Sequence, residues 1–100
     1  MANFLIYSLD KTALPPFEIS PMLRKQLQYF TDGEVRHAGS AHEFFFPLVR
    51  TSLLLEQGVF HVVSPLDDQN QAEIEITDEQ EDLLQWLVRN QIERVRVSEQ

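Results

Sequence analysis

One short segment holds several side chains that could do chemistry together. His37, Ser40, His42 and Glu43 all fall between positions 37 and 43. A serine beside a histidine that a carboxylate orients is the arrangement of an acyl-transfer nucleophile. A nucleophile elbow, however, has a glycine on both sides of its serine, and this segment has only Gly39. We therefore keep a small hydrolase as an alternative function, and a serine that caps a turn as the simpler interpretation.

The same segment could instead bind a metal ion together with a more distant histidine. His37, His42, Glu43 and His61 offer imidazole and carboxylate ligands, which suit zinc or another divalent transition ion. The spacing lacks the second histidine, four residues after the first, that marks a helical zinc site. The chain has no cysteine, which excludes thiolate zinc sites, disulfides and cysteine nucleophiles. We expect neither a metal nor a cofactor, and keep a metal-dependent enzyme as an alternative.

The charge distribution favours a protein partner over nucleic acid. The formal net charge is −8, whereas the phosphates of nucleic acid require clusters of Lys and Arg. A strand carrying Glu73 and Glu75 would also not stack bases as an RNA-binding sheet does. Half of the 16 acidic residues lie within 67–82, which suits a solvated strand and a first helical turn but could also dock a basic partner. We expect a protein partner or self-association, and no nucleic acid.

Two aromatic features could form an interface. Phe44, Phe45 and Phe46 are consecutive, and because side chains alternate along an extended segment, they cannot all point into one core. Trp86 lies at the edge of the apolar stripe of a predicted helix. Large aromatic side chains are common anchors of protein interfaces. We take these four residues as interface candidates, with packing inside the chain as the alternative.

We expect no signal for export or membrane insertion in this chain. Its first ten residues have no basic start, and their apolar run is too short for a secretory signal. The longest nearly apolar windows, such as 44–49, are far shorter than the roughly 18 residues of a membrane span. We therefore expect a cytoplasmic protein that does not enter the membrane.

The C-terminal part has the clearest secondary-structure pattern. Residues 72–76 and 92–97 alternate between apolar and charged residues, as half-buried strands do. The helix between them would begin with a capping box formed by Thr77 and Gln80, and Asn90 could adopt the left-handed conformation after its last turn. These elements predict a β–α–β unit in which the Glu and Arg residues of the two strands share the uncovered face of one sheet.

The rest of the chain supplies the remaining elements. Residues 3–9 are apolar on both faces, which suits a central strand, and 59–63 should form a hairpin with 72–76. For 21–31 we favour a helix over a hairpin turned at the Asp-Gly pair, because a serine and a proline stand at its start. A second helix would occupy 47–57, where its proline is tolerated at the beginning.

In order, these elements match the ferredoxin-like βαββαβ arrangement. We therefore predict one α+β domain over 1–100, a two-layer sandwich whose first crossover, 20–57, is elaborated. This architecture hosts many unrelated functions and does not decide between them. The leading hypothesis is a non-enzymatic protein-interaction or accessory module, which could be homo-oligomeric. A small-ligand regulatory domain that uses the open face of the sheet is a further alternative.

Overall fold

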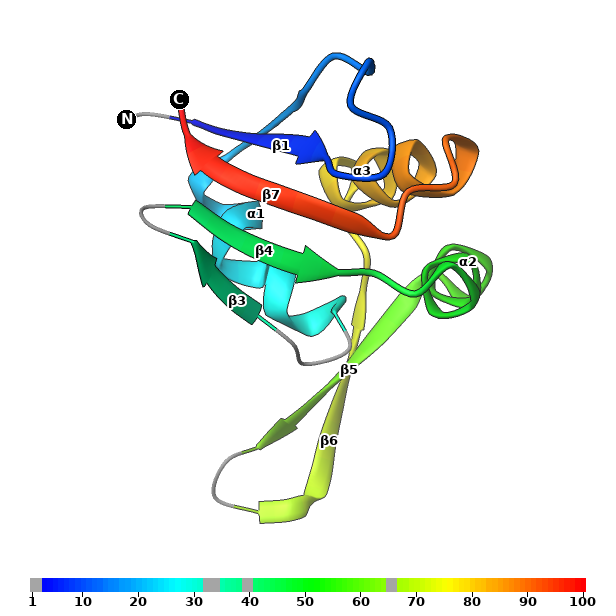
Figure 1. The fold of residues 1–100 in the computed structure, drawn as a ribbon. Coiled ribbons are helices and arrows are strands. Elements are labelled where there is room, and N and C mark those ends of the chain that lie inside the picture. Colours follow the sequence, from blue (N-terminus) through cyan, green and yellow to red (C-terminus); the bar gives the residue numbers. More distant parts are fainter. Residues whose placement is uncertain (1–2, 32–34, 39–40, 65–66) are drawn as a thin grey trace.

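The computed structural model describes residues 3–31, 35–38, 41–64 and 67–100, which form helices and two antiparallel sheets, an α+β architecture (Figure 1). The larger sheet has the order β2-β1-β7-β4-β3. Its strands are β1 (Phe4–Ser8), β2 (Phe17–Ile19), β3 (Val35–Ala38), β4 (Ala41–Phe45) and β7 (Arg94–Glu99). The smaller sheet, which we call the hairpin, consists of β5 (Val59–Ser64) and β6 (Asp67–Glu75). The helical segments are α1 (Pro21–Gln26), the 3-10 turn η1 (Leu27–Tyr29), α2 (Leu48–Gln57) and α3 (Asp78–Arg89).

The ferredoxin-like order predicted from the sequence is wrong, because the strands on either side of α3 belong to different sheets. The predicted hairpin of β5 and β6 does form, and β6 pairs with β5 rather than with the large sheet. A strand pairs with its neighbour along the chain at a small cost in loop-closure entropy. Both edges of β7 are occupied by antiparallel neighbours, β1 and β4. The segment 41–45, which the prediction placed in the crossover, is therefore an inner strand, and the parallel β–α–β unit does not form.

The predicted starts of α1 and α3 are confirmed. Ser20 caps α1, since its Oγ accepts the backbone N–H of Leu23 at 3.2 Å, and this favours the helix over the alternative hairpin. Thr77 and Gln80 form the predicted capping box of α3: the Thr77 hydroxyl accepts the N–H of Gln80, and the Gln80 side chain accepts the N–H of Thr77. Each cap satisfies backbone donors that the helix itself leaves unpaired.

The ends of α2 and α3 follow the sequence less closely. As predicted, α2 begins after Pro47 and ends at Gly58, which has a left-handed φ of 72°. At the end of α3, however, Asn90 has a φ of −96°, and the positive φ of 55° falls on Gln91. Asn90 donates its side-chain Nδ2–H to the carbonyl of Trp86 at 2.9 Å. This bond satisfies a carbonyl of the last turn, and the left-handed residue lies one position later than expected.

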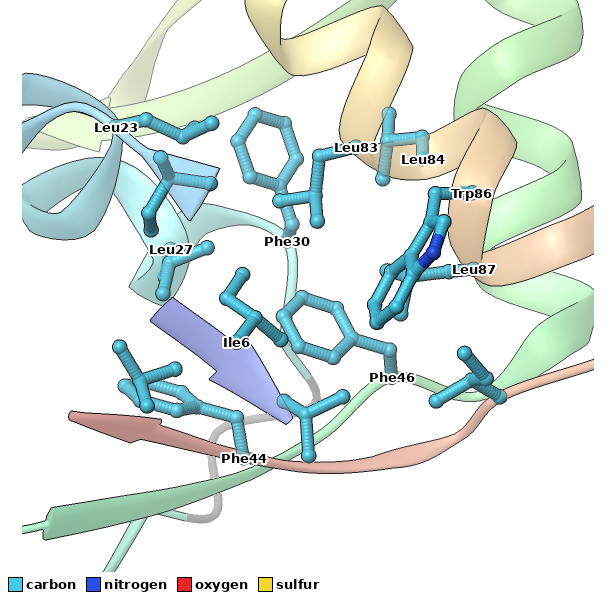
Figure 2. Packing of buried hydrophobic residues seen from close by; sticks show 14 of the residues in the cluster. Ile6, Leu23, Leu27, Phe30, Phe44, Phe46, Leu83, Leu84, Trp86 and Leu87 are labelled. Carbon is cyan, nitrogen blue, oxygen red and sulfur yellow. The ribbon is translucent and has the colours of Figure 1, made fainter. Parts of the chain in front are cut away.

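The core lies between the helices and one face of the five-stranded sheet (Figure 2). Along β1 and β7 every second residue points to the helices, as Ile6, Val95 and Val97 do. The most deeply buried apolar side chains come from both layers: Ile6, Ile19, Leu23, Leu27, Phe30, Phe46, Leu83, Leu84, Leu87, Ile92, Val95 and Val97.

The hairpin is attached to the rest of the molecule at its base and projects away from it (Figure 1). Phe60 on β5 packs against Tyr29 and Phe30, with ring centroids 5.8 and 4.9 Å apart. Residues 72–75 of β6 are exposed on both faces of the strand. Among the hairpin side chains that the structure describes, Phe60 therefore belongs to the core and Val62 packs against it, whereas 72–75 are exposed.

Candidate interaction surface

One face of the five-stranded sheet carries no helix of the described chain, and we call it the open face. Successive side chains of a strand point to opposite faces, and partners in register share a face. In Figure 1, α1 lies behind β7 and β4, and no helix lies in front of these strands. The side chains that the structure describes on the open face are each at least partly exposed: Leu5, Tyr7, Glu18, Glu43, Phe45, Arg94, Arg96 and Ser98.

The centre of the open face combines two aromatic rings with two guanidinium groups. Arg96 on β7 is in register with Tyr7 on β1 and with Glu43 on β4, and Phe45 is in register with Arg94. Side chains directly opposite each other in an antiparallel pair have Cβ atoms about 4.5–5.5 Å apart, so they can touch. Tyr7 is 39% exposed. Tyr, Phe and Arg are the residue types that protein interfaces favour over the remaining surface.

The ion pair of the open face is loose. Arg96 Nη2 lies 3.7 Å from Glu43 Oε1, and the two side chains are 48% and 29% exposed. Exposed pairs of this kind contribute about 0–1 kcal/mol to stability, so a carboxylate from a partner could replace Glu43 at little cost. Arg94 forms no ion pair within the described part of the chain. The open face therefore offers two guanidinium groups to an acidic partner.

Hydrogen bonds fix the start of β7, the strand that carries both arginines. Asp10 Oδ2 accepts the backbone N–H of Glu93 at 2.8 Å and that of Arg94 at 3.0 Å. The carbonyl of Glu93 accepts the N–H of Phe46 at 2.7 Å, and its Oε2 accepts the N–H of Leu48 at 3.1 Å. These bonds join the ends of β1 and β4 and the beginning of α2 to β7. The open face is thus built on a fixed frame, as a precise binding surface requires.

The structure separates the residues of the predicted catalytic site. His42 and Glu43 are consecutive on β4, so they lie on opposite faces of the sheet. Glu43 is beside Arg96 on the open face, whereas His42 Nδ1 accepts a hydrogen bond from Arg24 Nη2 on the helix side. Glu43 therefore does not orient His42, and the hydrolase alternative in which His37 activates Ser40 stays a prediction. His37 is the register partner of His42 on β3; its side chain, and all of Ser40, lie outside the described residues.

The environment of His42 gives it a structural role. The Arg24 guanidinium carbon lies 5.7 Å from the ring centroid of Phe4 and 5.1 Å from that of Phe44, within the range of cation–π contacts. Burial lowers the pKa of Arg24 from its ordinary value. His42 supplies this partly desolvated guanidinium with a hydrogen-bond acceptor, which a charged group away from water needs.

The candidate metal ligands are dispersed. His61 is exposed on β5, in register with Glu73, while His42 and Glu43 lie on β4 of the other sheet. Within the ranges that the structure describes, no group of three or more His, Asp or Glu side chains could hold a metal ion. The side chain of the fourth candidate, His37, lies outside those ranges. The described residues therefore provide no arrangement of ligands that supports the metal hypothesis.

Three of the four predicted interface aromatics are core residues. Phe44 and Phe46 are buried on the helix side, and Figure 2 shows Phe46 among the core side chains of the helices. Trp86 is also buried, because Phe17 of β2 covers the helix flank with its ring 5.3 Å away. These three side chains are therefore packed inside the chain and are not accessible to a partner. Phe45 alternates to the open face and remains an interface candidate.

Sequence reasoning missed that Tyr7, Arg94 and Arg96 share one surface. The apolar character of 3–9 indicated a strand buried on both faces, yet Tyr7 is accessible. The signal that could have found this surface is the segment 43–45, whose acidic and aromatic residues are in register with the two arginines. Opposite charges on alternating segments are typical of paired strands.

The partners expected for these arginines lie elsewhere. Glu73 and Glu75 were expected on the same sheet face, but both are on the hairpin, and Glu43 is the acid beside Arg96. The two glutamates therefore do not prevent base stacking on the five-stranded sheet. The net charge of −8 still disfavours nucleic acid.

Comparisons with known proteins assign no family. No protein-family model, no curated protein and no solved structure matches this chain. None of the helices in the described ranges is long and apolar enough to cross a membrane. The proposed function therefore rests on the surfaces of the molecule itself.

Proposed function

We propose that the protein is a non-enzymatic protein-interaction module and that the open face is its binding surface. The observation that carries this proposal is the pairing of Tyr7 with Arg96 on an uncovered sheet, with Phe45 and Arg94 beside them. Aromatic rings supply contact area, and a guanidinium group binds a carboxylate through two parallel hydrogen bonds. The separation of His42 from Glu43 supports a role that needs no catalysis.

The chemistry of the open face specifies what it would bind. Two exposed arginines favour a partner with carboxylates, and the uncovered sheet face favours an extended segment or another sheet. Five strands about 4.8 Å apart, with three to six residues each, cover roughly 300–400 Å². This is below the ~800 Å² per partner of a standard interface. A single contact on this face would therefore be weak and reversible unless a second contact supports it.

The size of the native complex tests this proposal. The full chain with a small tag is compared in extracts by native size-exclusion chromatography with the variant Tyr7→Ser/Phe45→Ser. A control, Lys25→Ser/Gln85→Ser, changes exposed helix positions instead. We expect the wild type and the control to elute as species larger than the monomer, and the open-face variant to elute as the monomer with an unchanged circular dichroism spectrum. A wild type that elutes as the monomer, or equal elution of all three, would contradict the proposal.

A further inference from the structure

The hairpin carries an exposed acidic side. Glu73 and Glu75 are two residues apart on β6, so their side chains point the same way, and His61 lies opposite Glu73 in register. Both glutamates are exposed, and within the described part of the chain neither carboxylate forms an ion pair. Ile74 points to the other side of the hairpin and is 41% exposed. The acidic side is therefore free to meet a basic surface.

The spacing of these carboxylates matches that of the arginines on the open face. Arg94 and Arg96 are also two residues apart on one strand, which corresponds to about 6.6–6.8 Å in both cases. Sheets stacked face to face lie about 10 Å apart, a gap that an arginine and a glutamate side chain can bridge together. A hairpin laid on the open face with β6 along β7 would place one carboxylate over each guanidinium group.

The two surfaces do not meet within one chain. β6 and β7 belong to different sheets, and among the side chains that the structure describes no ion pair joins Glu73 or Glu75 to Arg94 or Arg96. We infer that the open face of one copy binds the acidic side of the hairpin of a second copy, an inference that rests on the proposed function because it names the partner of the same surface. A reciprocal exchange about a two-fold axis, in which each hairpin lies on the open face of the other copy, uses both surfaces of each copy and closes a dimer.

The reciprocal arrangement doubles the contact area. The hairpin has two strands about 4.8 Å apart, in register over residues 59–64, so one contact would bury roughly 200 Å² on each side. Two equivalent contacts would bury roughly 800 Å² in total, below the size of a standard interface, so we expect a weak dimer that dissociates on dilution. The projecting hairpin suits this exchange, because it extends beyond the rest of the molecule (Figure 1).

Charge reversal on the two surfaces tests the inference. Arg94→Glu/Arg96→Glu makes both surfaces acidic, and Glu73→Lys/Glu75→Lys makes both basic. Sedimentation velocity of the purified full chain over a range of concentrations should show a wild-type dimer. Each variant should self-associate at least about tenfold more weakly, because like charges meet at close range. An equimolar mixture of the two variants restores opposite charges at both contacts, so we expect a heterodimer of nearly wild-type affinity.

Matched controls separate the contact from net charge and from folding. Lys11→Glu/Lys25→Glu changes the net charge by the same amount as the arginine variant, but at exposed positions outside both surfaces. Glu56→Lys/Asp82→Lys does the same for the glutamate variant. Ile74→Thr alters the opposite side of β6. All three should remain dimeric. Circular dichroism establishes that every variant is folded.

Two results would overturn the inference. One is a wild type that stays monomeric over the whole concentration range. The other is a mixture of folded charge-reversal variants that forms no heterodimer. Either failure is distinguishable from a failure of the proposed function. The proposed function still stands if extracts contain a larger species that the Tyr7→Ser/Phe45→Ser variant loses, and the partner is then a different protein.

Discussion

Arg96 and Tyr7 are cross-strand partners in the β1–β7 ladder, on the face of the sheet that no described helix covers. The pair results from the pairing of β7 with β1, and β7 lies between β1 and β4 in the five-stranded sheet. The same placement puts Glu43 on the other flank of Arg96. The composition of the proposed binding surface therefore follows directly from the strand order.

Engineered cysteine pairs test the strand order, and the absence of native cysteine keeps the result simple. The pair Glu43→Cys and Arg96→Cys joins register partners of β4 and β7, whose Cβ atoms lie close enough for a disulfide. We expect an intramolecular disulfide in dilute, mildly oxidised protein, measured as faster migration on a non-reducing gel. The control pair Tyr7→Cys and Glu73→Cys joins strands that a ferredoxin-like sheet would place side by side. An intramolecular bond in the control but not in the first pair would contradict this strand order.

Adjacent phenylalanines test which face of β4 is buried. Phe46→Ala should lower the free energy of unfolding by about 3–5 kcal/mol, because it leaves a cavity in the core. Phe45→Ala should lower it by about 1 kcal/mol, because its side chain is partly exposed on the open face. Urea denaturation of the two variants measures the difference. Equal losses, or a larger loss for Phe45→Ala, would show that the segment faces the other way.

The elements that could be predicted from the sequence are those that local chemistry determines. Ser20 and Thr77 are caps whose bonds lie within a few residues, and Pro47 and Gly58 limit a helix through backbone geometry alone. The hairpin was also predictable, because its strands are neighbours along the chain. Each of these features depends on contacts of short sequence separation.

The strand order could not be predicted, because alternation shows that a strand is half-buried but not which strand lies beside it. The residues 72–76 and 94–97 alternate equally well, yet one segment is in the hairpin and the other is in the five-stranded sheet. The covering of Trp86 by Phe17 likewise depends on a contact between distant parts of the chain. The open face was missed for this same reason.

The contact between Ser20 and Glu79 should stabilise the packing of α1 on α3. The Ser20 hydroxyl donates to Glu79 Oε1 at 2.6 Å and accepts the N–H of Leu23, and the Ser20 N–H donates to Glu79 Oε2 at 2.9 Å. Ser20→Ala removes both hydroxyl bonds, so we expect a loss of about 1–2 kcal/mol in urea denaturation. The control Ser52→Ala, at an exposed position of α2, should change stability by about 0.5 kcal/mol or less. Equal denaturation midpoints would refute this role.

The contact with Arg24 should determine the tautomer of His42. A guanidinium group has only donors, so His42 Nδ1 must accept, and the neutral imidazole carries its proton on Nε2. Long-range proton–nitrogen correlation spectra at neutral pH should show this tautomer for His42. Arg24→Met keeps an unbranched apolar stem but removes the guanidinium donor, and the nitrogen shifts of His42 should then move. Predominance of the Nδ1–H form in the wild type would rule out the hydrogen bond.

Site-specific photo-crosslinking in cells tests most directly whether the open face binds protein. A benzophenone amino acid replaces Tyr7 on the open face or, as the control, Gln85 on the exposed side of α3. We predict a discrete protein adduct from position 7 and none from position 85, and we predict its loss when Arg94 and Arg96 are both changed to Glu. No protein adduct from position 7, the same adducts from both positions, or adducts with nucleic acid instead of protein would contradict the proposed function.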